Sequence, residues 1–356
     1  MPVSTEKNFE NKLLLLGEWL HSQDKFSGQK LKIKPRKSSI TTGFSNETFV
    51  FNLSSKKMNE DFVLRLKPSG FKVFPNYDLH FQARIMRILR TKGLPTPEIL
   101  YYEVDESIIG SEFYIMNFIE GEAPSDNPPY HTDPEGMMGK ASQEQRRSVW
   151  LEWLYYMSIL HSQELEELDL DEFLGGHIGT GSLDKELIYY EEFLKWGMKG
   201  EENLVCEEAL KWLNVNKPKN IQAYKLCWGD CRPGNILYKD FKAKALLDWE
   251  MATVGDPVMD LAWGLAVDDS SSLGLEIPKL EGSIENQEAI DIWEKNTGFS
   301  TKNYSYYRLL ALFKFSVIMV RVAKKLIIND IIPLDSDFYK NNYVSNYLKK
   351  EFENIV

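Results

Sequence analysis

Apolar residues near the start of the chain recur at helical spacing. Phe9, Leu13, Leu16 and Leu20 fall on one face of a helix, so the pattern predicts an amphipathic helix over residues 7–21. The charges of this segment do not form a basic face, which favours packing against the protein over binding to a membrane.

The segments that follow alternate between apolar and polar positions, with a period typical of strands. Between residues 31 and 66 they are rich in β-branched residues and predict strands of a twisted antiparallel sheet. A helix is predicted over residues 78–91, closed by a Lys-Gly C-cap signal. Two further strands are predicted over residues 98–103 and 112–118. This β-β-β-α-β-β order indicates a small lobe built on one sheet.

The rest of the chain is predicted to be mainly helical. It begins with a proline-rich stretch, Ala123–Pro134, which reads as a connection between lobes, and Ser142 then provides a helix cap. Helical spacing predicts helices over residues 143–162, 184–196, 258–265, 286–296 and 304–328. A chain of 356 residues is long enough for two lobes, and we assign them to residues 1–119 and 120–356.

Residues 226–250 carry the clearest candidate chemistry. Asp230 is followed by a cation at Arg232, an amide at Asn235 and a second carboxylate at Asp248. The spacing D-x-R-P-x-N is that of a kinase catalytic loop. Asp230 could take the proton from an acceptor hydroxyl, and Arg232 could contact the transferring phosphoryl group. Asn235 and Asp248 could hold Mg²⁺ against nucleotide phosphates.

Apolar runs flank both acids and predict a β-hairpin after the loop. Residues 236–238 follow the loop, residues 245–247 precede Asp248, and a polar turn separates the two runs. The second strand would end at Asp248, so the two metal ligands can converge across the hairpin. A carboxylate at the end of a buried strand is costly unless it is paired or bound to a metal, which gives this motif more weight than a chance D-x-x-x-x-N.

In these motifs the sequence resembles the aminoglycoside phosphotransferase-like small-molecule kinases, which share the protein-kinase-like fold with choline kinases and fructosamine kinases. The resemblance implies a two-lobed α+β fold, with a small antiparallel β-sheet in the N-lobe and a mainly helical C-lobe. Trp228 stands where most members of the family have a His. This departure from the family pattern resembles a bacterial branch that has the motif W-G-D-x-R-P-G-N. The resemblance covers most of the chain and rests on GFSNETFVF (43–51), FVLRL (62–66), FYIMNFIEG (113–121), WGDCRPGNILY (228–238) and LLDWEMATVGDPVMDLAW (246–263).

The resemblance also implies a nucleotide site, with ATP and Mg²⁺ between the lobes. A turn at Gly43, Ser45 and Asn46 would approach the phosphates, since Gly has no side chain and Asn tolerates positive φ, although hairpin turns use the same residues. Arg65 would bind the α- and β-phosphates, with Gln82 as its helix partner where the family usually has Glu. The hinge that would bind the adenine through main-chain groups corresponds to Met116, Asn117, Phe118 and Ile119.

Four other residues near the motifs are interpreted more conservatively. In the family, the residue corresponding to Asp260 braces the catalytic loop through its backbone. We expect His161 to be a packed or capping residue, and Trp228 to pack under the loop. Glu250 is close enough in sequence to Asp248 to share the metal or to contact a cationic substrate. A solvated carboxylate explains Glu250 equally well.

The composition of the chain indicates which kinds of partner and which cellular location to expect. A net charge of −11 argues against nucleic acid, because nucleic-acid binders concentrate positive charge. Three cysteines are too few and wrongly spaced for a zinc site, and their odd, sparse count suits a reducing, cytoplasmic location. No segment of the sequence is predicted to span a membrane. The sequence is compatible with a homodimer.

We therefore expect an ATP- and Mg²⁺-dependent phosphotransferase acting on a small-molecule hydroxyl acceptor. Acidic residues between 164 and 202 would attract a polycationic aminoglycoside, but solvated helix faces explain them as well. The branch is also similar to phosphotransferases found beside acyl-CoA dehydrogenases, which favours an endogenous hydroxylated metabolite or a hydroxyacyl thioester. Two alternatives stay open: an inactive kinase-like nucleotide-binding or regulatory protein, and a true aminoglycoside kinase.

Overall fold

The computed structural model describes residues 3–26, 28–36, 47–170 and 183–355. Gly43, Ser45 and Asn46 of the predicted phosphate turn lie outside these ranges. The chain forms two compact units. The first contains Met1–Lys72, Asn76–Arg87 and Pro97–Ile119, and the second contains Val73–Pro75, Ile88–Thr96 and Glu120–Val356.

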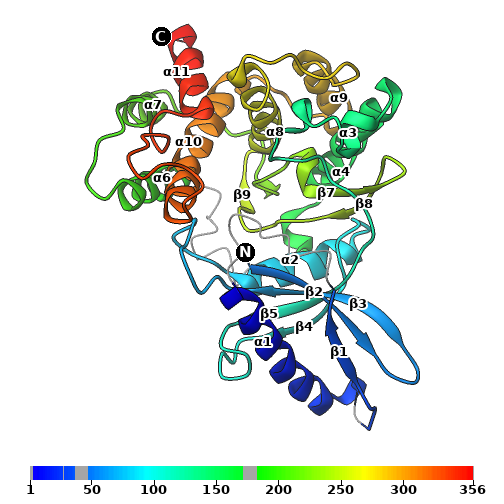
Figure 1. Ribbon diagram of the computed structural model, residues 1–356. Helices are drawn as coiled ribbons and strands as arrows, with labels where there is room; N and C mark the ends of the chain where they lie inside the picture. The colour runs from blue at the N-terminus through cyan, green and yellow to red at the C-terminus, as the bar shows by residue number, and fades with distance from the viewer. Residues whose placement is uncertain (1–2, 27, 37–46, 171–182, 356) are drawn as a thin grey trace. The chain divides into compact units, whose positions relative to one another are not determined.

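The first unit is built on one five-stranded antiparallel sheet (Figure 1). Among its described residues, the helices are α1 (Val3–Ser22) and α2 (Leu79–Thr91), of which the part up to Arg87 belongs to this unit. Both helices and the strand segments agree with the periodicity of the sequence. The spatial order of the strands is β1 (Lys32–Pro35), β2 (Glu47–Ser54), β3 (Asn59–Leu66), β5 (Phe113–Asn117) and β4 (Ile99–Glu103).

The apolar face of α1 is buried against this sheet. Leu13 and Leu16 belong to the same buried cluster as the strand residues Phe51 and Leu64. Phe9 stacks on a phenylalanine of β2, with the ring centroids 4.2 Å apart. The helical stripe seen in the sequence is therefore part of the hydrophobic core of this unit, as predicted.

The second unit is mainly helical and holds two small antiparallel sheets (Figure 1). One sheet pairs β6 (Lys225–Cys227) with β9 (Thr253–Gly255), and the other is the hairpin of β7 (Ile236–Lys239) and β8 (Lys242–Leu246). In the described part of this unit the helices are α3 (Met137–Lys140), α4 (Gln143–Ser162), α6 (Leu183–Met198), α7 (Leu204–Val215), α8 (Val258–Ser270), α9 (Asn286–Thr297), α10 (Tyr304–Ile328) and α11 (Tyr343–Ile355). Among the described residues, no helix has the length and apolarity needed to cross a membrane.

Helix α8 is longer than its sequence pattern predicts, because two acids in its last turn are buried with cationic partners. The Lys279 ammonium lies 2.7 Å from Asp268 and 2.6 Å from Asp269, and Arg308 lies 2.8 Å from Asp269. Burial alone would lower the pKa of Lys279, but the two carboxylates outweigh it and raise that pKa. These ion pairs fasten the end of α8, beyond the predicted residue 265, to neighbouring segments.

Helix α8 packs closely against other parts of the unit at Gly264. A Cβ at this position would lie 2.3 Å from a ring atom of Trp153 in α4 and 2.6 Å from the carbonyl oxygen of Cys231. Both neighbours are buried, so neither can move away easily. The absence of a side chain at Gly264 therefore lets α8 approach α4 and the loop that contains Cys231.

We expect Gly264→Ala to destabilise the protein by about 1–3 kcal/mol through overpacking, although Gly→Ala inside a helix usually stabilises. The measurement is the free energy of unfolding in urea. Gly70→Ala is the matched control, because a Cβ at Gly70 would meet no atom within 4 Å. A Gly264→Ala protein as stable as the wild type would show that the close approach does not constrain the fold.

Candidate active site

The loop between β6 and β7 brings three of the predicted residues into one hydrogen-bonded group. The side-chain amide of Asn235 donates to the backbone oxygen of Asp230 at 2.9 Å and to Asp230 Oδ2 at 2.7 Å. The Nε atom of Arg232 donates to Asp230 Oδ1 at 3.0 Å. A 3-10 turn at Pro233–Asn235 folds the chain back so that Asn235 reaches Asp230.

Arg232 is bound by two carboxylates. Besides Asp230, it pairs with the exposed Asp126, which lies 2.5 Å away in the part of the second unit that precedes α3. Burial would lower the pKa of Arg232, but the attraction of Asp126 and Asp230 outweighs it and raises the pKa above its ordinary value. The guanidinium is thus a fixed positive charge beside Asp230.

Asp248 comes close to this loop through the β7–β8 hairpin. Ile236 pairs with Leu246 in the hairpin, and the N–H of Leu247 donates to the carbonyl oxygen of Asn235 at 2.9 Å. The strand β8 ends at Leu246, slightly earlier than predicted, and Asp248 follows with a φ of 61°, a left-handed conformation that Asp tolerates. The two proposed metal ligands therefore extend from hydrogen-bonded neighbouring segments, as the hairpin pattern suggests.

Trp228 joins the two segments as well as packing beneath them. It is fully buried and stacks on Trp249, with ring centroids 5.0 Å apart and an interplanar angle of 17°. Its indole N–H donates to the carbonyl oxygen of Leu247 at 2.8 Å. The sequence predicted only a packing role, but the indole also supplies a ring N–H donor at the position where the family usually has a His.

Gly229 is required where the loop crosses the segment after Asp248. Its φ is 85°, and a Cβ would lie 1.9 Å from the carbonyl oxygen of Met251. An L-residue would be strained in this conformation and would collide with the backbone. The Gly of W-G-D therefore permits direct contact between the loop and the Asp248 segment.

Asp260 braces the loop through its backbone, as predicted. Its carboxylate accepts the N–H of Trp228 at 2.6 Å and the N–H of Gly229 at 2.8 Å. It also lies 3.0 Å from His161 Nε2, and the other ring nitrogen of His161 accepts the indole N–H of Trp293 at 3.1 Å. Because Trp293 can only donate, His161 carries its proton on Nε2 and donates it to Asp260.

The ligand atoms of His161, Cys227 and Asp260 lie within 4.8 Å of one another, a spacing that could suit a metal. Both ring nitrogens of His161 are engaged in hydrogen bonds, however. Burial raises the pKa of the Cys227 thiol well above its ordinary value, so the thiolate that a metal would bind is disfavoured. We interpret this cluster as a hydrogen-bond network that supports the loop.

The residues predicted to bind the nucleotide lie in the first unit. Arg65 is on β3 and donates to the hydroxyl of Thr48 at 3.3 Å, and Gln82 is buried in α2. Met116 and Asn117 end β5. The N–H groups of Asn117 and Phe118 donate to backbone oxygens of Glu98 and Asp61, so sheet pairing already uses these two hinge donors.

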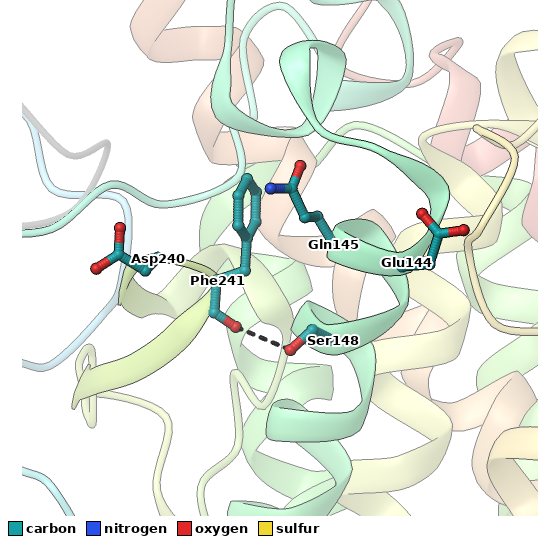
Figure 2. Close-up of a pocket in the computed structure, with 5 residues that line it drawn as sticks. All are labelled: Glu144, Gln145, Ser148, Asp240 and Phe241. Carbon is teal, nitrogen blue, oxygen red and sulfur yellow. Dashed lines mark hydrogen bonds between the residues drawn. The ribbon is translucent and has the colours of Figure 1, made fainter.

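A surface recess in the second unit lies away from the motif residues. Figure 2 shows that it is formed by the start of α4 and the tip of the β7–β8 hairpin, where the Ser148 hydroxyl donates to the carbonyl oxygen of Phe241 at 3.1 Å. None of Asp230, Arg232, Asn235 or Asp248 lines it. We therefore do not assign the acceptor to this recess.

The hydrogen bonds that Asp260 accepts from the loop predict that the protein loses stability when the charge of this carboxylate is removed. Asp260→Asn should lower the free energy of unfolding by about 2–4 kcal/mol, because an amide N–H₂ would face a backbone N–H that needs an acceptor. Urea unfolding measures this, and Asp291→Asn, an exposed change in α9, should be nearly neutral. Equal stability of the two variants would contradict a bracing role for Asp260.

Comparison with known proteins places these features in context. Human acyl-CoA dehydrogenase family member 11 is 27% identical over 315 residues, which cover 84% of this chain but only 37% of the relative. This chain therefore spans little more than a third of that protein's length.

Solved structures show the same fold at low identity. A putative aminoglycoside phosphotransferase from Ralstonia eutropha has a TM-score of 0.68 and 18% identity, with 96% of this chain and 98% of that chain covered. A thermostable mutant aminoglycoside phosphotransferase in complex with AMP-PNP and hygromycin B has a TM-score of 0.55 and 13% identity, covering 94% and 98%. The predicted α+β, kinase-like fold is confirmed. The model of the phosphotransferase enzyme family matches residues 38–277, and the chain belongs to this family.

Proposed function

We propose that this phosphotransferase moves the γ-phosphoryl group of ATP, with Mg²⁺, to a hydroxyl group of a small molecule. The observation that carries the proposal is the hydrogen-bonded group of Asp230, Arg232 and Asn235, with Asp248 on the segment bonded to Asn235. Family membership supports phosphoryl transfer by a small-molecule kinase. The related fold that was solved with AMP-PNP supports a nucleotide as the donor.

The donor set fits a magnesium ion. Both N–H groups of the Asn235 amide face oxygens of Asp230, so the amide oxygen is left to coordinate a cation. This oxygen and the Asp248 carboxylate are the hard ligands that Mg²⁺ prefers. When bound, the ion would neutralise charge on the nucleotide phosphates.

Asp230 and Arg232 would act on the acceptor and on the phosphoryl group. In this proposal Asp230 accepts the proton of the acceptor hydroxyl as the phosphoryl group arrives. The fixed charge of Arg232 would stabilise the negative charge of that group. In the first unit, Arg65 would bind the α- and β-phosphates, with Gln82 as its partner. The adenine would contact main-chain groups of residues 116–119 other than the N–H groups of Asn117 and Phe118, which bond to Glu98 and Asp61.

We propose an endogenous hydroxylated compound as the acceptor. The relatives are named for acyl-CoA dehydrogenases, which favours a hydroxylated metabolite or a hydroxyacyl thioester over an antibiotic. Some acids of the α6 region already have cationic partners within the protein, since Glu186 is paired with Lys314 and Glu191 with Lys195. Electrostatic attraction of a polycation is therefore weaker than the sequence count of acids suggests.

Separate substitutions of the two acids test their separate roles. We expect Asp230→Asn to lower kcat by about 10²–10⁴, because the carboxylate base is lost. ATP affinity should stay nearly unchanged, because the backbone oxygen of residue 230 and the oxygen of the new side-chain amide can still accept the N–H groups of Asn235. Asp248→Ala should instead remove the Mg²⁺-dependent part of ATP binding, measured by titration calorimetry. Asp240→Asn, an exposed change on the same hairpin, is the control. Equal loss of ATP affinity in the first two variants would contradict this division.

An acceptor screen tests the substrate class. ATP consumption should be measured with the purified protein against kanamycin-type antibiotics, choline, sugars and hydroxyacyl-CoA compounds. We expect a hydroxylated metabolite to be turned over and the antibiotics to be poor acceptors. Efficient antibiotic turnover at micromolar KM would reverse this order and identify the chain as an aminoglycoside kinase.

A further inference from the structure

A tryptophan distant in sequence from the catalytic loop donates directly to the proposed base. Trp263 lies on α8, is 4% exposed, and its indole N–H donates to Asp230 Oδ1 at 2.7 Å. From its sequence context Trp263 could equally have been a core residue or part of an apolar pocket. The structure gives its one polar atom a specific partner.

The hydrogen bonds to the Asp230 carboxylate are distributed unevenly over its two oxygens. Oδ1 accepts two N–H groups, from Arg232 at 3.0 Å and from Trp263 at 2.7 Å. Among the described residues, Oδ2 accepts one, from Asn235 at 2.7 Å. An ionised carboxylate offers about four acceptor sites, two on each oxygen. Oδ1 is therefore filled, and Oδ2 keeps a site for one more donor.

The ring of Trp263 is itself fixed by its surroundings. The Lys314 ammonium lies 5.6 Å from the centroid of the Trp263 ring and pairs with Glu186 at 2.6 Å. Phe315 packs beside the same indole, with ring centroids 5.8 Å apart. A cation near an aromatic face and a packed ring partner both restrict the ring, so the N–H keeps its direction toward Asp230.

We propose that Trp263 is a positioning residue: with Arg232 it occupies Oδ1 of Asp230, so that Oδ2 is the oxygen that takes the acceptor's proton. The proposal rests on the proposed function, in which Asp230 is the base. In the step, the O–H bond of the acceptor breaks and an Oδ2–H bond forms. The acceptor oxygen bonds to the γ-phosphorus, and ADP leaves with the electrons of the broken P–O bond.

Trp263→Phe removes the donor and keeps a ring for Lys314 and Phe315 to contact. We expect kcat to fall about 10- to 100-fold, the range for losing one hydrogen bond to a charged group, while KM for ATP is unchanged. The matched control is Trp150→Phe, because Trp150 is also fully buried but its indole N–H has no acceptor among the described residues. A wild-type kcat for Trp263→Phe would overturn the proposal.

A second measurement tests the hydrogen bond between Trp263 and Asp230 without measuring enzyme turnover. The chain has nine tryptophans, and the indole N–H signal of Trp263 in a ¹⁵N-labelled sample is identified by its loss in Trp263→Phe. In the Asp230→Asn protein this signal should move upfield, because the indole loses its charged acceptor. An unmoved signal would overturn the proposal whatever the kcat of Trp263→Phe.

The two failures can be distinguished. If the wild-type protein transfers phosphoryl to no acceptor, the proposed function fails, and the indole signal still reports whether Trp263 donates to Asp230. If the wild type is active and neither kcat nor the signal responds, only the positioning role of Trp263 is wrong.

Discussion

The geometry of the candidate site depends on one buried carboxylate. Asp260 accepts the backbone N–H groups of Trp228 and Gly229 at the point where the chain leaves β6 for the catalytic loop. Backbone donors that turn away from a strand have no partner in a sheet, and leaving them unpaired in the interior is costly. The carboxylate supplies both partners at once, and His161 and Trp293 fix its orientation from the other side. The chain that carries Asp230 therefore starts from a defined direction.

From that point, short-range contacts place the remaining groups. Gly229 passes against Met251, the indole of Trp228 bonds to Leu247, and the amide of Leu247 bonds to Asn235. Each contact links the catalytic loop to the segment that contains Asp248. The geometry of the acids is thus a property of two backbone segments joined at three places, and side-chain packing alone does not set it.

Much of this arrangement could be predicted from the sequence, and the exceptions have physical reasons. Helices α4 and α10 follow their apolar periodicity, and the D-x-R-P-x-N spacing fixes Asp230 and Asn235 within one tight turn. The contact of Trp263 with Asp230 could not be predicted, because it joins residues on different elements and an apolar helix pattern does not reveal where one indole N–H points. Likewise, the extension of α8 beyond residue 265 could not be predicted, because Asp268 and Asp269 find their partners Lys279 and Arg308 in segments distant in sequence.

The pattern of apolar and polar residues also did not predict helices α7 and α11 or the pairing of β6 with β9. The strands of that pair have only three residues each, too few for alternation to be recognised. The pairing nevertheless matters to the site, because β6 leads into the catalytic loop and β9 follows the Asp248 segment. The roles of the nucleotide-binding residues of the first unit remain predictions.

The stacked pair of Trp228 and Trp249 gives the chain an optical probe of the loop that carries Asp230. The two indoles lie nearly parallel and are almost fully buried. Trp228 directly precedes Gly229, and Trp249 directly follows Asp248. Aromatic side chains in a fixed chiral setting generate near-ultraviolet circular dichroism, which disappears when specific packing is lost even if secondary structure persists. Loosening of the loop that carries Asp230 would therefore change the near-ultraviolet circular dichroism even where the helices stay folded.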